Sequence, residues 1–358
     1  MSNFWRRLWG STRHFRPALV LVIVLFAVFA ATQPAFLGAR NLQNLLTAVA
    51  VLWIVSIGMT FVTITGGIDL SAGATVALVG IFIGKMVNYT PVPSWVTIIL
   101  SIVIGVAIGA FLNGVLIGRL GMSFFVVTLA TMTALTGVVN LWSNSLTDTV
   151  ADPAIAWVGV ERTLGMPTPI WIMIIVFLIA LFVQNRTHFG RDIYAVGGSI
   201  AAARLSGIRV ERTIMAAYAI VGGCAGLAGV IAVGRIGAAT PQVDGDLPLQ
   251  AAAAVLLGGT ALIGGSGGVG GTAVGVLFIG ILQNGLSISG VQSYWQQVVT
   301  GVILVAAVLG ERFQRRGKGT RRWFGELAQM RMKRGGDDAG ADGQVGPETS
   351  QNAGEQSR

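Results

Sequence analysis

Long apolar stretches, separated by short polar or basic segments, make up most of the chain as far as residue 310. A helix needs roughly 20 apolar residues to cross about 30 Å of hydrocarbon. Runs of about this length predict ten membrane-spanning helices, at residues 17–32, 45–65, 70–87, 95–117, 123–142, 168–184, 213–233, 248–263, 268–288 and 295–310. The pattern therefore predicts an all-α integral membrane protein.

The basic residues set the direction of these spans, because Lys and Arg are retained on the cytoplasmic side. With a cytoplasmic N-terminus, only four of the 24 Lys and Arg residues fall in outer segments: Arg40, Lys85, Arg162 and Arg235. We therefore expect both termini to be cytoplasmic. The first span also fits a secretory signal peptide, but no small-x-small cleavage site follows it, which favours an uncleaved anchor.

The domain organisation follows from these spans and from a change in composition near the end of the chain. A basic cytoplasmic N-terminus (1–16) precedes a transmembrane permease domain (17–310) with a long inner loop at 185–212. A basic cytoplasmic segment (311–332) and a polar tail (333–358) follow. The tail is too polar to bury a core, so its composition predicts disorder.

Composition excludes most classes of soluble protein. Hydrophobic residues make up 53% of the chain and charged residues 11%, whereas a soluble domain has about a quarter charged residues. The net charge of +9 does not predict nucleic-acid binding, because the basic residues are spread over separate short segments. One cysteine, Cys224, and two distant histidines, His14 and His188, predict neither a disulfide nor a metal site.

The chain carries no set of residues for catalysis and no GxxxxGK[ST] phosphate loop. A GxGxxG pattern occurs at Gly265, Gly267 and Gly270, but it lies between apolar spans, without the acidic residue of a dinucleotide site. It predicts a tight turn or a broken helix. We therefore expect a protein that is not an enzyme and binds no cofactor of its own.

Two glycine-rich breaks interrupt the spans. Interrupted helices are tolerated at membrane depth only where they are buried in protein or line a wet cavity. The breaks therefore predict the translocation pathway or its gate, at Thr65, Gly66, Gly67, Asp69, Ser71, Gly258, Gly259, Gly264 and Gly265. The Asp69 carboxylate has two compatible interpretations: it shapes the pathway or inner gate, or it caps the helix that follows.

The long inner loop contains a predicted short amphipathic helix at 199–208. Ala202, Leu205 and Ile208 fall near one face of this helix, with Arg204 beside them. Such a helix docks into another protein or rests on anionic lipid. Composition alone favours lipid.

Three segments carry a resemblance to a known family. Residues 65–73 resemble the GGIDLSxG signature of permeases in ribose-, xylose- and arabinose-type ABC importers. Residues 189–208 are similar to the cytoplasmic coupling segment of that family, and residues 257–271 to its LGGTSLxGGxGxxxGT stretch. The three segments occur in the family's order, and the resemblance covers roughly residues 15 to 312.

The resemblance implies a bacterial inner-membrane protein with several partners: a second permease copy, forming a homodimer, a cytoplasmic ABC ATPase that binds ATP and Mg, and an extracytoplasmic sugar-binding protein. The residues that would couple to the ATPase are Gly198, Ala202, Ala203, Arg204, Leu205, Ser206 and Gly207. Ile200 and Ala201 depart from the polar or acidic residues common in relatives at these positions. The outer segments 143–167 and 234–247 would either meet the binding protein or form solvated loops; their acidic residues are Asp148, Asp152, Glu161, Asp244 and Asp246.

The predicted function is passage of a monosaccharide, energised by the ATPase on another chain. A permease for branched-chain amino acids, nucleosides or a furanosyl signal molecule is an alternative. Amino-acid relatives usually have Asn-Phe and His-Gly where this chain has Asp69-Leu70 and Ala72-Gly73, which favours a sugar. An ion-coupled secondary carrier is a further alternative, but such carriers use buried ionisable relays, which are scarce here.

Overall fold

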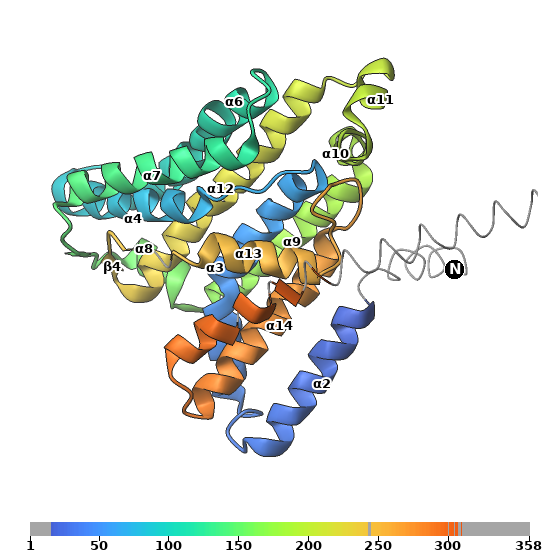
Figure 1. Cartoon of the computed structure of the whole chain (residues 1–358). Coiled ribbons are helices and arrows are strands. Elements are labelled where there is room, and N and C mark those ends of the chain that lie inside the picture. Colours follow the sequence, from blue (N-terminus) through green and yellow to red (C-terminus); the bar gives the residue numbers. More distant parts are fainter. Residues whose placement is uncertain (1–15, 243–244, 300, 304, 307–308, 310–358) are drawn as a thin grey trace, which may run out of the picture. The chain divides into compact units, whose positions relative to one another are not determined.

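The computed structural model describes residues 16–242, 245–299, 301–303, 305–306 and 309 (Figure 1). The described residues from 16 to 306 belong to one compact unit. Its helices are α2 (Arg16–Thr32), α3 (Ala39–Ile64), α4 (Ala72–Tyr89), α5 (Ser94–Ala107), the π-helix η2 (Ile108–Gly114), α6 (Val115–Gly118), α7 (Phe124–Ser143), α8 (Pro153–Gly159), α9 (Thr168–Arg186), α10 (His188–Gly198), α11 (Ile200–Leu205), α12 (Val210–Ile236), α13 (Leu247–Leu257) and α14 (Val269–Ile288).

Four two-residue strands complete the described structure. They are β1 (Asp148–Thr149), β2 (Arg162–Thr163), β3 (Met166–Pro167) and β4 (Ala238–Ala239). β1 pairs with β4 and β2 pairs with β3, both antiparallel. These strands only join loops, so the predicted all-α membrane class is confirmed.

The number of membrane-length helices differs from the prediction. Within the described residues, seven helices rather than ten are long and apolar enough to cross a membrane. The apolar part of α2 and the whole of α13 are shorter than a span. The predicted eighth span, 248–263, loses its second half because the helix ends at Leu257 and an irregular loop follows.

Several predictions concern residues that are not described. The predicted tenth span, 295–310, lies partly outside the described residues, although residues 293–299 are helical. Residues 1–15 and 310–358, which include the predicted terminal segments, also lie outside them. The cytoplasmic location of both termini therefore stays a prediction.

Helix α3 lies at the centre of the bundle. In its most apolar stretch 78% of the residues are buried, compared with 28% in the runs of α5–η2–α6, α7 and α9. It packs against α9, α12, α13 and α14. The peripheral helices instead expose large aliphatic side chains, as lipid contact requires. Burial thus separates an inner group of helices from an outer group.

Glycines allow α5 and η2 to approach α12 at backbone distance. Gly105 and Gly109 face Gly222 and Gly226, and each pair has the four-residue spacing that places both glycines on one helix face. A Cβ added at Gly105 would collide with the carbonyl group of Gly222, and one at Gly109 with the carbonyl group of Tyr218. This contact fixes the position of η2, which carries part of the site described below.

We predict that Gly105→Ala destabilises the purified protein. The added methyl group must force α5 and α12 apart, and such overpacking costs about 1–3 kcal/mol. Gly270→Ala on α14 is the matched control, because its Cβ would meet no atom within 4 Å. Thermal unfolding in detergent should show a lower Tm for Gly105→Ala alone, and equal Tm values for the two variants would contradict the close packing.

Candidate functional site

The first break joins α3 to α4 through residues 65–71. Gly66 has φ +89°, a conformation that favours glycine, and turns the chain away from the α3 axis. Asp69 follows, with only 2% of its surface exposed. Its Oδ1 accepts hydrogen bonds from the Ser71 N–H at 2.8 Å and from the Ser71 hydroxyl at 2.6 Å. Asp69 therefore binds the residue before α4 and stabilises the turn into that helix.

Asn113, on the π-helix η2, completes this cluster. It is fully buried, and its Nδ2 donates to Ser71 Oγ at 2.8 Å and lies 3.3 Å from each carboxylate oxygen of Asp69. Single-turn π-helices are frequent at functional sites, and here the wider turn carries the amide that faces Asp69. The sequence analysis did not select Asn113, although an amide within an apolar run is a signal that could have revealed it.

The second break, residues 258–268, reaches the first through backbone contacts. The Gly265 N–H donates to the carbonyl oxygen of Ile64 at 2.9 Å. Gly66 lies so close to Ile263 that an added Cβ would stand 3.0 Å from the Ile263 carbonyl oxygen. Gly264 and Gly265 both have positive φ, +93° and +72°. The two glycine-rich breaks, far apart in the sequence, are thus in direct contact.

A third segment, the end of α10, meets them at the same point. A Cβ on Gly197 would collide with the Ile64 carbonyl oxygen, so the backbones of 197–198 and 64–67 touch. We call the three segments 64–67, 197–198 and 263–268 the glycine junction. In Figure 1 the loop between α13 and α14 lies beside α10 and the end of α3. Part of the predicted coupling segment therefore contacts part of the predicted gate.

Two side chains hold the second break in place. The Tyr194 hydroxyl donates to the Gly267 carbonyl at 2.7 Å, and Gln184 Oε1 accepts from the Val269 N–H at 2.7 Å. Burial raises the pKa of Tyr194 to about 12, so its hydroxyl remains a donor at neutral pH. These contacts attach loop 258–268 to α10 and the first residue of α14, directly after the loop, to α9.

Three other predicted pathway residues make contacts of a different kind. Gly258 packs α13 against α14, since its Cβ would collide with Gly271. Gly259 forms a turn with φ +85°. The Thr65 hydroxyl donates to the Val62 carbonyl at 2.7 Å, within its own helix end. Of the nine predicted residues, five fall within the segments of the glycine junction, and three of these make its close backbone contacts: Gly66, Gly264 and Gly265.

The predicted coupling helix is shorter and oriented differently from the prediction. It ends at Leu205 rather than Ile208, because Gly207 with φ +80° turns the chain towards α12. Ala203 is its buried residue, and it packs with Val196 and Val210. Ala202 and Leu205 are exposed, Leu205 by 91%, whereas Ile208 lies beyond the helix and packs against the same cluster as Ala203. That Ala202 and Leu205 dock on a partner or on lipid stays a prediction.

Polar contacts anchor the remaining coupling residues. Arg204 forms an ion pair with Glu211 of α12 at 3.1 Å, and the Ser206 hydroxyl donates to the Ala202 carbonyl at 3.0 Å. Gly198, just before α11, is exposed. α11 is therefore a short helix held in place by its neighbours, and Leu205 is its most exposed apolar side chain.

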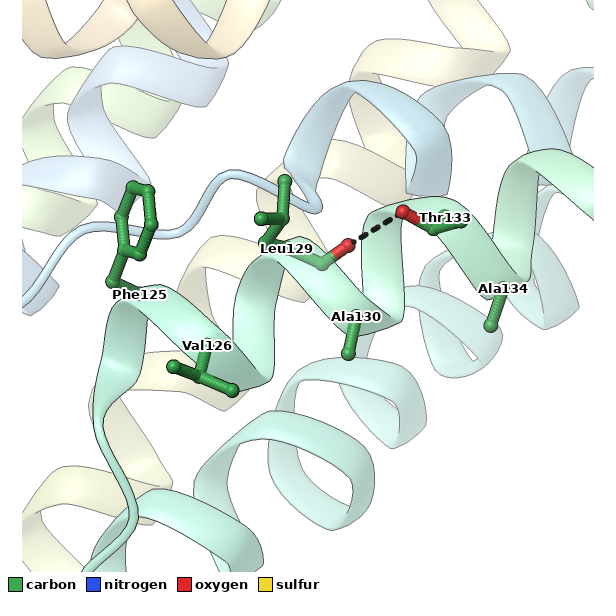
Figure 2. Close-up of a pocket in the computed structure, with 6 residues that line it drawn as sticks. All are labelled: Phe125, Val126, Leu129, Ala130, Thr133 and Ala134. Atoms are coloured by element: carbon green, nitrogen blue, oxygen red, sulfur yellow. Dashed lines mark hydrogen bonds between the residues drawn. The ribbon is translucent and has the colours of Figure 1, made fainter.

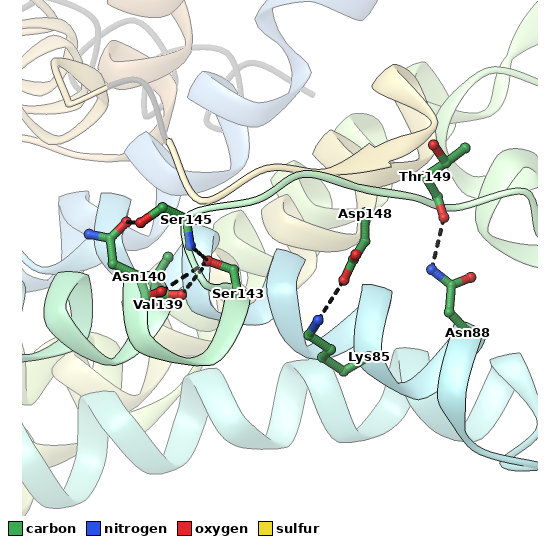
Figure 3. Close-up of polar contacts among 8 residues, drawn as sticks. All are labelled: Lys85, Asn88, Val139, Asn140, Ser143, Ser145, Asp148 and Thr149. Atoms are coloured by element: carbon green, nitrogen blue, oxygen red, sulfur yellow. Dashed lines mark hydrogen bonds and ion pairs between the residues drawn. The ribbon is translucent and has the colours of Figure 1, made fainter.

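Two of the predicted outer acidic residues have partners within the chain. Asp148 pairs with Lys85 at 2.8 Å, and beside it the Asn88 amide donates to the Thr149 carbonyl at 2.9 Å (Figure 3). Asp152 caps α8 by accepting from Ala154 N and Ile155 N. Both carboxylates thus tie loops together, while Asp244 lies outside the described residues.

Seven helices of membrane length, packed around two helix breaks that touch each other, define a polytopic membrane protein within the described residues. Residues 41–308 match the family described as "Branched-chain amino acid transport system / permease component", and the chain belongs to this family. It is a multi-pass protein of the bacterial inner membrane.

Curated relatives include permeases named for two sugars. The chain is 40% identical to the ribose import permease protein RbsC of Escherichia coli (strain K12) over 82% of its length and 92% of the relative. It is 40% identical to RbsC of Bacillus subtilis (strain 168), over 85% of this chain and 94% of the relative. It is 32% identical to the xylose transport system permease protein XylH of Escherichia coli (strain K12), over 81% and 89%. No solved structure matches the chain.

We predict that Asn113→Leu lowers stability by about 1–3 kcal/mol, because a buried carboxylate and hydroxyl lose a hydrogen-bond donor. Asn88→Leu removes a hydrogen bond at an exposed position, so its cost should stay within about 0.5 kcal/mol. Denaturant unfolding of the purified variants measures both values. Equal stabilities would mean that Asn113 does not support Asp69.

Proposed function

We propose that this chain is the membrane-spanning permease subunit of an ATP-binding-cassette importer for a monosaccharide of the ribose or xylose type. The observation that carries the proposal is the similarity to ribose and xylose permeases over nearly their whole length. The chain has no phosphate loop of its own, so ATP and Mg bind to a separate cytoplasmic ATPase subunit. A binding protein delivers the sugar from outside.

Helix α11 is the proposed contact with the ATPase. Its buried residue Ala203 and the Arg204–Glu211 ion pair hold it against α12, while Leu205 points away from the protein. A leucine that is 91% exposed on an ordered helix can be covered by a partner, and full burial of such a side chain contributes about 1.5–3 kcal/mol. The predicted role of 198–207 in coupling is thereby assigned to one side chain.

We expect Leu205→Asp to abolish copurification of the permease with its ATPase subunit. A carboxylate in an apolar pocket costs several kcal/mol, and a loss of about 3 kcal/mol weakens association more than 100-fold. Leu164→Asp is the matched control, because Leu164 is 85% exposed in the turn between β2 and β3. Unchanged copurification of Leu205→Asp would remove α11 from the interface.

Uptake by proteoliposomes tests the function itself. Vesicles that contain the permease, the ATPase and the binding protein should accumulate radiolabelled ribose or xylose when ATP is supplied, and should not accumulate leucine. Uptake driven by an ion gradient without the ATPase would identify a secondary carrier instead. Preferential uptake of leucine would identify the amino-acid branch of the family.

The exposed face of α7 is the proposed contact with a second permease copy. α5 and α9 expose large apolar side chains, such as Leu178, Ile179 and Phe182, which suit lipid. The exposed side of α7 also carries large apolar side chains, such as Phe125 and Val126, but the small residues Ala130 and Ala134 lie between them. Figure 2 shows Phe125, Val126, Leu129, Ala130, Thr133 and Ala134 along it. Small residues allow close packing between membrane helices, so this face suits a homodimer.

Ala134→Trp should therefore convert a dimeric permease to monomers in detergent, since the indole ring occupies space needed by the second copy. Ile179→Trp on the lipid-facing side of α9 should leave the dimer intact. Light scattering coupled to size-exclusion chromatography measures the mass of each variant. A dimer that tolerates Ala134→Trp would exclude this part of α7 from the interface.

A further inference from the structure

We propose that the glycine junction is the joint that transmits movement of α11 to both helix breaks. Tyr194 and Gln184 act as positioning residues that keep loop 258–268 attached to this joint. The inference rests on the proposed function, because it assumes that an ATPase moves α11. It adds the path along which that movement reaches the transmembrane helices.

The first step runs from α11 to α10. Only Ser199 separates the two helices, and its hydroxyl accepts a hydrogen bond from the Ala202 N–H at 3.3 Å. Val196 of α10 and Ala203 of α11 are both buried in one cluster with Val210. Since these side chains pack together without exposed surface between them, a displacement of α11 carries the end of α10 with it.

The second step runs from α10 to the first break. Gly197 touches the Ile64 carbonyl oxygen and the Gly265 N–H without any side chain in between. A side chain can absorb a small displacement by changing its rotamer, whereas backbone in contact with backbone cannot. The end of α3 must therefore follow the end of α10.

The third step couples the two breaks. The Gly265 N–H donates to Ile64 at 2.9 Å, so loop 258–268 is bonded to the end of α3. The same loop is bonded to α10 by Tyr194, and Gln184 of α9 accepts from Val269, the first residue of α14 directly after the loop. The stacked rings of Phe61 and Phe189, with centroids 6.1 Å apart, form a further contact between α3 and α10. The loop is thus held between α3, α9 and α10, and it moves when α10 moves.

The test uses the complete importer in proteoliposomes, with ribose as the transported probe. For each variant we would measure copurification of the ATPase, ATP hydrolysis stimulated by the binding protein, and ribose taken up per ATP hydrolysed. Tyr194→Phe and Gln184→Met each remove one hydrogen bond to the loop. Gln184→Glu keeps an oxygen acceptor for the Val269 N–H and serves as the conservative rescue.

We expect Tyr194→Phe and Gln184→Met to retain the ATPase and its hydrolysis but to lower ribose uptake per ATP by about two- to tenfold. Gln184→Glu should restore the ratio. Gly197→Ala should abolish uptake, whereas Gly270→Ala, whose Cβ would meet no atom within 4 Å, should leave it unchanged. A merely structural role would lower the amount of folded protein without changing this ratio.

An unchanged ratio in Tyr194→Phe and Gln184→Met would overturn the inference. Loss of ATPase copurification in these variants would also overturn it, because the residues would then shape the docking surface instead of the joint. Failure of the proposed function has a different signature. In that case the unaltered permease would neither retain the ATPase nor take up ribose with ATP.

Discussion

The backbone of a membrane protein must satisfy its own hydrogen-bonding groups, because hydrocarbon offers no partners. A helix that breaks within the bundle frees such groups, and another part of the chain has to meet them. Here the break after α3 and the break after α13 meet this requirement together. The carbonyl group of Ile64 at the end of α3 accepts the N–H of Gly265. The contact at the glycine junction is a consequence of this requirement.

Glycine makes these contacts possible at several places for one reason. Without a Cβ, two backbones approach to distances that any side chain would prevent. The approach of α5 to α12 sets the position of the π-helix η2, and η2 places Asn113 beside Asp69. The glycine at position 197 places the end of α10 against α3 in the same way. Packing of small residues therefore determines where the few buried polar groups lie.

The polar groups described at the helix breaks and in the loops hold segments of the backbone in place. The one buried carboxylate within the first break, Asp69, is surrounded by neutral donors from Ser71 and Asn113 and stabilises a turn. Asp148 pairs with Lys85 on α4, and Asp152 caps α8. Leu205 is exposed on α11, and Ala203 of the same helix packs against Val196 of α10. These features fit a subunit whose energy comes from a partner.

The sequence by itself determined the membrane class, most helix positions and the family, because apolar length and ordered glycine motifs are local properties of the chain. It also indicated the two breaks. Only the tertiary structure decided that the breaks touch each other and the end of α10, since these contacts join residues more than 60 positions apart. The buried face of α11 could not be predicted from the sequence either. Val196 of α10 and Val210 of α12 cover Ala203 and leave Leu205 exposed. Likewise, the amide of Asn113 gains its role only when the packing of α5 against α12 brings η2 to Asp69.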